Sequence, residues 1–514
     1  MRIITLLFVV SLFSCQQEPT YPPLEENTSH LQDQSLAPFY HGVASGDPLT
    51  TGIVLWTRVT PSTQLPEIEV EWEVAADKAF NKVALSGKVT TDASKDYTVK
   101  IDISTGLEPG TPYYYRFKAL DGVSMTGKTK TAPQLAQSLR FAVVSCSNYE
   151  FGYFNAYARI AEEKDLSAVI HLGDYIYEYG PGRYGDTTIG RLNIPPHEII
   201  SIQDYRDRYA QYRLDPDLRA VHANHPFINI WDDHEITNNS YKDGAENHQD
   251  DEGDYKTRKA VAKQVYYEWL PIRDGAAHYR AFSFGELADL IMLDERLAGR
   301  TKQVDSLTDA TLQNEERSML GQEQLAWFQQ QLSTSKARWK LIGNQVIFSY
   351  LDWGFPTFSI NLDAWDGYPA EQQRVADFIK SNAIKNLIFL TGDTHSSWAF
   401  EVTNNPKEGY IPATGEGAFA VEFGVTSINS SNSNERAPTD SVLVHEKKIV
   451  NTSINPHLKY ANMRDHGYML LELDGEKARA TYKYVETLRK RDDRIRTETS
   501  LQVKSGEVKL EVVN

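Results

Sequence analysis

Between residues 39 and 132, apolar and polar side chains alternate along several short segments of the chain. The segments 52–58, 68–74, 97–101 and 113–117 carry this period of two, which is typical of a strand with one buried face. Turn-forming pairs such as Pro109-Gly110 separate them. The pattern predicts a small antiparallel β-sandwich in the N-terminal part of the chain.

After residue 133 the apolar residues form continuous runs, as expected for strands that are buried on both faces. Residues 153–163 instead place Phe154, Tyr157 and Ala161 on one helical face, which predicts a strand–helix–strand unit. These features predict a layered α/β domain with its site at the strand ends. The predicted strands are 139–144, 168–172, 227–231, 287–293, 339–342 and 386–390.

The first residues have the pattern of an export signal. Arg2 precedes an apolar run over residues 3–13, which is followed by Ser14-Cys15. A run of about 11 residues is too short to span a bilayer as a helix, so residues 1–14 are predicted to be a cleaved signal peptide. The end of the run is similar to a bacterial lipobox, which implies a lipid-modified Cys15. Residues 15–37, rich in Gln, Pro and Glu, are predicted to form a flexible tether.

The chain of 514 residues has a formal charge of −17, from 53 basic and 70 acidic residues. This charge repels polyanions and argues against a dedicated nucleic-acid partner. It suits cations, although an acidic surface more often serves solubility. Of the two cysteines, Cys15 belongs to the lipobox-like sequence and is expected to be lipid-modified, so Cys146 has no disulfide partner within the chain. Cys146 is therefore either a buried apolar residue or a thiolate that binds a metal.

Polar clusters follow four of the predicted strands directly, at the point where each strand ends. A single cluster of this kind is more often a turn or a helix cap. Four of them at the ends of strands in one layered domain favour a shared site at the sheet edge. The clusters are Ser145-Cys146-Ser147, Gly173-Asp174 to Glu178, Asp232-Asp233-His234-Glu235 and Gly392-Asp393-Thr394-His395.

Taken in order, these clusters resemble the metallophosphoesterase superfamily and, within it, the PhoD-like alkaline phosphatases and phosphodiesterases. The resemblance extends over residues 38–480 and includes Gly343-Asn344-Gln345 and Asn455-Pro456-His457. It implies an α/β (α+β layered) metallophosphoesterase sandwich over residues 138–485. A fibronectin type III-like β-sandwich over residues 38–133 is expected before it, and a C-terminal segment over residues 486–514 after it.

The resemblance implies a site for two metal ions, with Asp174 shared between them. The first ion would have sulfur, phenolate and imidazole ligands, a set that suits Fe³⁺. The second would have carboxylate oxygens only, which favours Ca²⁺, with Mg²⁺, Mn²⁺ or Zn²⁺ as other possibilities at the site. Two such ions can orient a phosphoryl group and activate water for in-line attack. The implied ligands are Cys146, Tyr177 and His395 for the first ion and Asp233 and Asp393 for the second.

Four further side chains are candidates for catalysis or substrate binding. His234 directly follows a ligand and could protonate the leaving alkoxide as general acid. Arg296 resembles the family's Asp-x-Arg motif and could fork onto phosphate oxygens, with an ordinary surface ion pair as the alternative. Asn238 and Asn344 follow matched motifs and could contact the substrate or support the ligands.

The expected function is hydrolysis of phosphate esters by an exported enzyme that is lipid-anchored in the bacterial cell envelope. Two alternatives stay open. The first is a phosphodiesterase or phospholipase D-like enzyme, since such a metal site does not separate monoesters from diesters. The second is a noncatalytic surface lipoprotein that only binds metal. The sequence lacks the Gly-x-Ser-x-Gly, P-loop and His-Glu-x-x-His motifs, which argues against serine hydrolases, nucleotide switches and zincins.

Overall fold

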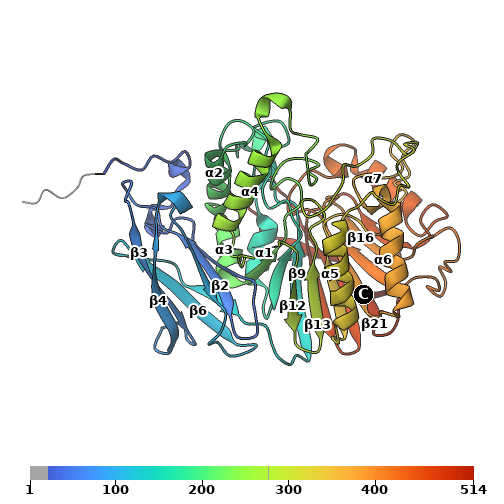
Figure 1. The fold of residues 1–514 in the computed structure, drawn as a ribbon, viewed down its shortest axis with the longest axis horizontal. Helices are drawn as coiled ribbons and strands as arrows, with labels where there is room; N and C mark the ends of the chain where they lie inside the picture. The colour runs from blue at the N-terminus through green and yellow to red at the C-terminus, as the bar shows by residue number, and fades with distance from the viewer. Residues whose placement is uncertain (1–20, 276, 514) are drawn as a thin grey trace, which may run out of the picture.

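The computed structural model describes residues 21–275 and 277–513. The predicted signal peptide and the predicted lipid-modified Cys15 lie outside the described residues. Two large sheets face each other in the body of the molecule, and helices cover their outer faces (Figure 1). A smaller sheet packs at the N-terminal end. Within the described ranges, no helix combines the length and the apolar character needed to cross a membrane.

The first large sheet has ten strands, in the order β22-β21-β20-β19-β9-β10-β11-β1-β2-β5. Its centre is parallel and consists of β9 (Ser138–Val144), β10 (Ala168–His171) and β11 (Pro226–Asn229). An antiparallel ladder extends one side with β19 (Gly467–Asp474), β20 (Lys477–Val485), β21 (Ile495–Lys504) and β22 (Glu511–Val513). The predicted C-terminal segment therefore supplies the last two strands of this sheet.

The second large sheet has seven strands, in the order β12-β13-β14-β15-β17-β16-β18. Four neighbouring strands run parallel: β13 (Ala288–Met292), β14 (Trp339–Gly343), β15 (Leu387–Thr391) and β17 (Ala420–Gly424). The antiparallel strands are β12 (Arg280–Phe284), β16 (Ser397–Val402) and β18 (Leu458–Asn462).

The continuous apolar runs are strands that bury both faces, as predicted. In β9, Phe141 and Val143 face the core between the two sheets, whereas Ala142 and Val144 face the helices. The helices over the ten-stranded sheet are α1 (Asn155–Glu162), α2 (Ile202–Arg213), α3 (Pro216–Asn224) and α4 (Tyr255–Trp269). Those over the seven-stranded sheet are α5 (Gly321–Thr334), α6 (Pro369–Ser381) and α7 (Thr439–Ile449). The predicted strand–helix–strand unit is β9-α1-β10.

The N-terminal sandwich shares a sheet with the body of the molecule. Strand β1 (Val43–Gly46) pairs in parallel with β11, and β2 (Ile53–Arg58) and β5 (Thr98–Ile103) continue the ten-stranded sheet. The opposing sheet contains β3 (Ile68–Ala75), β4 (Val83–Thr91), β6 (Pro112–Ala119), β7 (Gly122–Val123) and β8 (Gly127–Lys130). The alternating segments are thus strands, but one of the two sheets is common to both parts of the chain.

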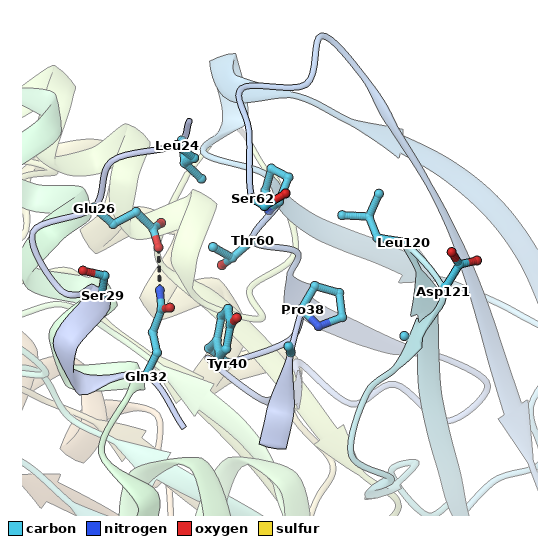
Figure 2. A pocket seen from close by; sticks show the side chains of 13 residues that line it. Leu24, Glu26, Ser29, Gln32, Pro38, Tyr40, Thr60, Ser62, Leu120 and Asp121 are labelled. Atoms are coloured by element: carbon cyan, nitrogen blue, oxygen red, sulfur yellow. Dashed lines mark hydrogen bonds between the residues drawn. The ribbon is translucent and has the colours of Figure 1, made fainter. Parts of the chain in front are cut away.

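Part of the predicted tether lies against this sandwich (Figure 2). Glu26 forms an ion pair of 2.6 Å with the nearly buried Arg58, and it accepts a hydrogen bond of 2.7 Å from Gln32. Asn27 donates a hydrogen bond of 2.5 Å to Asp207 of α2. Residues 26–32 are therefore held in place by specific polar contacts, although the composition of the segment alone predicted a free linker.

Candidate metal centre and active site

Four candidate ligands lie on turns that follow the central parallel strands. Cys146 follows β9, Asp174 follows β10, and Asp393 and His395 follow β15. All four have φ angles between 56° and 61°, a left-handed region that residues other than glycine rarely adopt. Such conformations cost free energy and persist where the surrounding structure fixes them, commonly at functional sites. Single residues with such angles also occur in surface turns such as that of Asp121, but four of them gather at this one edge of the two sheets.

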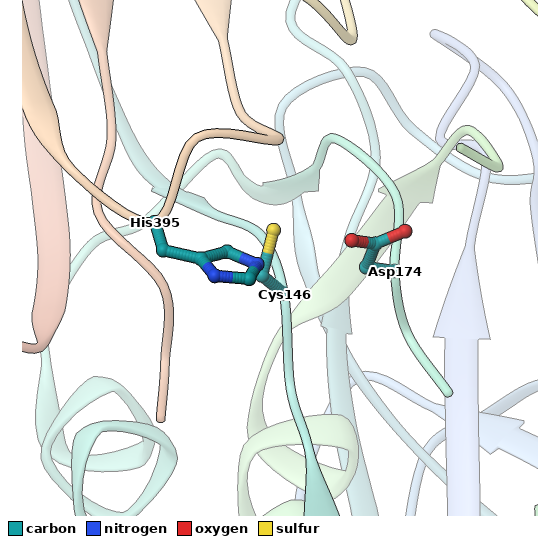
Figure 3. Close-up of side chains that lie close together, drawn as sticks. All are labelled: Cys146, Asp174 and His395. Atoms are coloured by element: carbon teal, nitrogen blue, oxygen red, sulfur yellow. The ribbon is translucent and has the colours of Figure 1, made fainter. Parts of the chain in front are cut away.

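Three of these side chains form one compact group (Figure 3). The Cys146 sulfur, a carboxylate oxygen of Asp174 and a ring nitrogen of His395 lie within 4.8 Å of one another. The Tyr177 hydroxyl donates to Asp174 Oδ2 at 3.0 Å and lies 3.0 Å from His395 Nε2. The structure therefore brings together the side chains predicted for the first ion.

Asp233 connects this group to further carboxylates. Ligand atoms of Asp174, Asp233 and His234 lie within 4.8 Å of one another, and so do those of Asp232, Asp233 and Asp393. Asp174 is thus shared between two adjacent groups, as expected of a bridging ligand. Its Oδ1 atom is buried without a hydrogen-bond partner among the described residues, and burial raises the pKa of Asp174 well above its usual range. A buried carboxylate oxygen of this kind is costly unless a cation binds it, so the residues present fit a metal ion.

His395 is oriented to offer one nitrogen. Its Nδ1 lies 2.6 Å from the backbone carbonyl oxygen of Ser431, which can only accept, so Nδ1 carries the proton. Nε2 is then an acceptor and faces Tyr177. Burial lowers the pKa of His395 to about 3, which keeps the imidazole neutral. A neutral imidazole fixed through its other nitrogen is the form in which histidine binds metals.

His234 lies beside Asp174 and Asp233 and is held by a buried partner. Its Nδ1 lies 2.6 Å from Glu178 Oε2. Glu178 also accepts from Asn247 Nδ2 at 2.9 Å and from the backbone N–H of Asn238 at 2.8 Å. Although burial opposes a charge on His234, Glu178 and Asp233 hold the pKa of His234 well above its usual range. His234 therefore lies at the site beside Asp233, and Glu178 orients its imidazole ring.

Arg296 lies among the carboxylates and has no exposed surface. Its Nε donates to Asp232 at 2.5 Å, and its terminal nitrogens donate to Asp363 at 2.7 Å and to Asp393 at 3.3 Å. Contrary to the prediction, this guanidinium is not placed to fork onto a substrate phosphate, because its donors already face protein carboxylates. It is not a surface ion pair either. The structure makes Arg296 a buried counter-charge for the ligand cluster.

The two candidate asparagines have different positions. Asn238 lines the cavity into which the candidate ligands open. Asn344 is fully buried: its Nδ2 donates to the backbone oxygen of Val346, and its Oδ1 accepts from Trp365 Nε1 at 3.3 Å. Of the two roles expected for Asn344, the structure excludes the substrate contact, since both ends of its amide are bonded inside the protein, and the side chain supports the turn that follows β14.

Glu235, which the sequence analysis left without a role, joins two ligand loops. Its carboxylate accepts the backbone N–H groups of Asp174 at 3.0 Å, Tyr175 at 2.6 Å and Asp232 at 2.9 Å. The loops after β10 and β11 are therefore fixed to each other through one buried side chain. Its place in a strand-end cluster was the signal that could have indicated this role.

The ligands open into a cavity of about 370 Å³. This volume accommodates a phosphoryl group together with part of a larger ligand. Several lining residues lie on loops without a recognisable motif, so the sequence did not indicate them. These are Tyr179, Asn239, Trp353, Phe358, Asn361, Ser431, Asn432 and Arg436.

The chain matches one family over most of its length. Residues 141–482 match the PhoD-like phosphatases, and residues 26–133 match the N-terminal domain of PhoD-like phosphatases. Alkaline phosphatase D of Bacillus subtilis (strain 168) is 38% identical over 471 residues, which cover 87% of this chain and 77% of that protein.

Solved structures agree with this match. A structure of PhoD aligns with a TM-score of 0.83 and 35% identity over 93% of each chain. A purple acid phosphatase from yellow lupin (Lupinus luteus) seeds has the same fold, with a TM-score of 0.57 and 14% identity over 90% of this chain and 73% of that one. The expected metallophosphoesterase fold is confirmed. The chain belongs to the PhoD-like phosphatase family and is a phosphoester hydrolase.

Proposed function

We propose that this hydrolase is an exported alkaline phosphatase whose activity depends on two unlike metal ions. The observation that carries the proposal is the position of Asp174. This buried carboxylate, with one oxygen unpartnered in the described structure, is shared between a group containing sulfur and imidazole and a group containing Asp233. A shared carboxylate between unlike donor sets is typical of a mixed two-metal site.

The two donor sets suit different ions. Cys146, Tyr177 and His395 offer sulfur, phenolate and imidazole, a combination that favours Fe³⁺. Asp233 and Asp393 offer oxygens only, which favours Ca²⁺, with Mg²⁺, Mn²⁺ or Zn²⁺ as the other ions to be tested at the site. When bound, such ions supply Lewis-acid activation of the phosphoryl group and of water.

The remaining steps fall to residues of the chain itself. His234, held protonated by Glu178, can give a proton to the leaving oxygen as the ester bond breaks. Glu178 fixes the imidazole through Nδ1, which leaves Nε2 as the donating atom. Arg296 keeps Asp233 and Asp393 in place by neutralising part of their charge. Asn238 at the cavity wall can contact the substrate.

Metal removal and the substitution Asp174→Asn test this proposal together. Both are expected to abolish hydrolysis of an aryl phosphate, and elemental analysis should show that the variant has lost the bound metals. Asp121→Asn is the matched control, because Asp121 lies in an exposed turn with a similar φ angle of 58° and far from any candidate ligand in sequence. Activity that survives both chelation and Asp174→Asn would contradict a metal-dependent reaction.

The same assay compares an aryl phosphate with its bis-aryl diester. A monoesterase should prefer the monoester, and a preference of tenfold or more for the diester would favour the phosphodiesterase or phospholipase D-like alternative. A protein that binds metal but hydrolyses neither ester would support a noncatalytic lipoprotein.

Export and anchoring are proposed from the pattern of residues 1–15. The protein should partition with membranes, and Cys15→Ser should release it into the soluble fraction of the envelope. Unchanged membrane association of the variant would exclude a lipid on Cys15. The fibronectin type III-like character of the N-terminal sandwich is likewise a proposal, supported by its two packed antiparallel layers.

A further inference from the structure

The loop formed by residues 351–363, here called the aromatic loop, brings two apolar side chains to a cavity that is lined mainly by polar residues. It carries Trp353, Phe355 and Phe358 and contains no helix or strand. Trp353 and Phe358 line the cavity into which Asp174 and His395 open. Their ring centroids are 5.6 Å apart, and Phe358 is 45% exposed. Exposed aromatic rings beside a binding site commonly serve ligand contact, since burying them inside would stabilise the fold more.

The motif Asn455-Pro456-His457 binds the first residues of the aromatic loop through hydrogen bonds. The sequence singled out this motif, but it contributes no candidate metal ligand. Asn455 accepts the backbone N–H of Asp352 at 3.0 Å and donates to its carbonyl at 2.7 Å. His457 Nε2 lies 2.8 Å from the carbonyl of Tyr350. Both side chains are fully buried. Asn455-Pro456-His457 therefore fixes the backbone immediately before Trp353.

The other end of the loop is tied to the ligand cluster. Asp363 pairs with Arg296 at 2.7 Å, and Arg296 also bonds Asp232 and Asp393. In between, the backbone N–H of Trp353 donates to the carbonyl of Ser359 at 2.7 Å, which closes the tip of the loop. The aromatic rings consequently have a fixed relation to the carboxylates, which a ligand contact requires if it is to discriminate between substrates.

The polarity of the cavity divides it into two parts. The ligand side is lined by carboxylates and imidazoles, and a further polar part by Asn238, Asn239, Ser431, Asn432 and Arg436. Tyr179 and Tyr184 also line the cavity, but each carries a hydroxyl group, so Trp353 and Phe358 are the most apolar side chains among the described lining residues. A phosphoryl group suits the first part, so the apolar part is left for whatever is attached to it.

We propose that Trp353 and Phe358 form a subsite for the leaving group, and that this subsite favours phosphate esters of aromatic or heteroaromatic alcohols over those of small alkyl alcohols. A flat ring can stack on the two side chains, whereas a small alkyl group gains little contact. Asn455 is a positioning residue for this subsite. The inference rests on the proposed function, because it concerns the same cavity.

Selectivity for phenyl phosphate over methyl phosphate tests the subsite. The two esters differ in intrinsic reactivity, but this difference cancels when the ratio of their kcat/KM values in a variant is divided by the wild-type ratio. Trp353→Ala and Phe358→Ala are each expected to lower the ratio about tenfold, since stacking of an aromatic group is worth roughly one factor of ten. Phe355→Ala is the matched control: Phe355 lies on the same loop but stacks on His445, with ring centroids 4.0 Å apart, and does not line the cavity.

Binding of the two corresponding phosphonates separates recognition from chemistry. Calorimetry on the metal-loaded protein should show about tenfold weaker binding of phenylphosphonate to Trp353→Ala, while methylphosphonate changes less than about twofold. Asn455→Ala should shift the same ratio in the same direction at unchanged metal content, because it removes both hydrogen bonds to the backbone of Asp352.

Three outcomes decide. An equal loss of kcat/KM for both esters would show that the aromatic loop only supports the fold, and it would overturn the proposal. An unchanged ratio in both kcat/KM and phosphonate affinity would overturn it as well. Failure of the metal-loaded wild-type protein to hydrolyse any ester would refute the proposed function, while the phosphonate affinities would still confirm or refute the apolar subsite.

Discussion

The candidate metal centre contains more carboxyl groups than cationic side chains. Burial raises the pKa of Asp174 well above its usual range and raises the pKa of Asp393 to about 7. Burial acts in the same direction on Asp233, but Arg296 and His234 outweigh it and lower the pKa of Asp233 to about 2. Two cationic side chains thus serve a cluster of several carboxylates. The imbalance is what a bound cation would remove.

The role of His234 can be tested through the leaving group. If Nε2 donates a proton to the leaving oxygen, His234→Gln should slow hydrolysis of an alkyl phosphate by about 10²–10⁴-fold. An ester of p-nitrophenol, whose leaving oxygen needs no proton, should lose far less. Glu178→Gln should give a smaller loss with the same dependence, because it weakens the charge on His234 but leaves the ring in place. Equal losses for both esters would argue that His234 acts through the metal ligands instead.

Replacing Arg296 should affect stability more than substrate affinity. Arg296→Met leaves the buried Asp232 without its counter-charge, whereas Asp363 keeps its pair with Arg300, and the change is expected to cost about 3–5 kcal/mol in the free energy of unfolding. Urea unfolding of metal-free protein measures this without a contribution from lost ions. Arg489→Met is the control, because its pair with Asp186 is largely exposed and should contribute less than about 1 kcal/mol. If Arg296→Met left the stability unchanged but raised KM for the phosphate ester, the result would support the contact between Arg296 and phosphate that was predicted from the sequence.

Among the elements, strands and ligand turns could be predicted because local pattern determines them. Continuous apolar runs gave β9, β10 and β15, and polar residues at their ends gave the turns that carry Cys146 and Asp174. Strand neighbours could not be predicted: alternation shows which face of a strand is buried but not which strand lies beside it. The direction of a side chain could not be predicted either. The sequence spacing around Arg296 is compatible with a guanidinium that faces the cavity and with one that faces the carboxylates.

The shared sheet predicts that the catalytic part does not fold alone. Strand β1 covers the edge of β11, and Trp56 of β2 packs on Trp269 of α4 with ring centroids 5.7 Å apart. A chain that begins at residue 134 would expose that edge and the apolar face of α4. We expect it to be insoluble or to unfold without a cooperative transition, whereas residues 21–514 should remain soluble and cooperative. A soluble, metal-binding fragment in size-exclusion chromatography and thermal unfolding would show two independent domains.

At the scale of the whole molecule, the candidate ligands come from both sheets. Cys146, Asp174 and Asp233 follow strands of the ten-stranded sheet, whereas Asp393 and His395 follow β15 of the seven-stranded sheet. The core between the sheets is apolar, and the metal centre lies at its edge. A metal ion bound there would connect the two layers of the sandwich, in addition to its part in hydrolysis.

Removal of the metals should therefore lower the unfolding temperature as well as the activity. An ion that binds only the folded state at about 1,000 times its Kd adds about 4 kcal/mol to the free energy of unfolding, so re-addition should raise the unfolding temperature in a concentration-dependent way. Asp174→Asn should start near the temperature of the metal-free wild type and respond little to added metal, whereas Asp121→Asn should respond fully. Equal unfolding temperatures for metal-loaded and metal-free protein would contradict this prediction. Apolar contacts between the two sheets would then account for the stability of the sandwich without a bound metal.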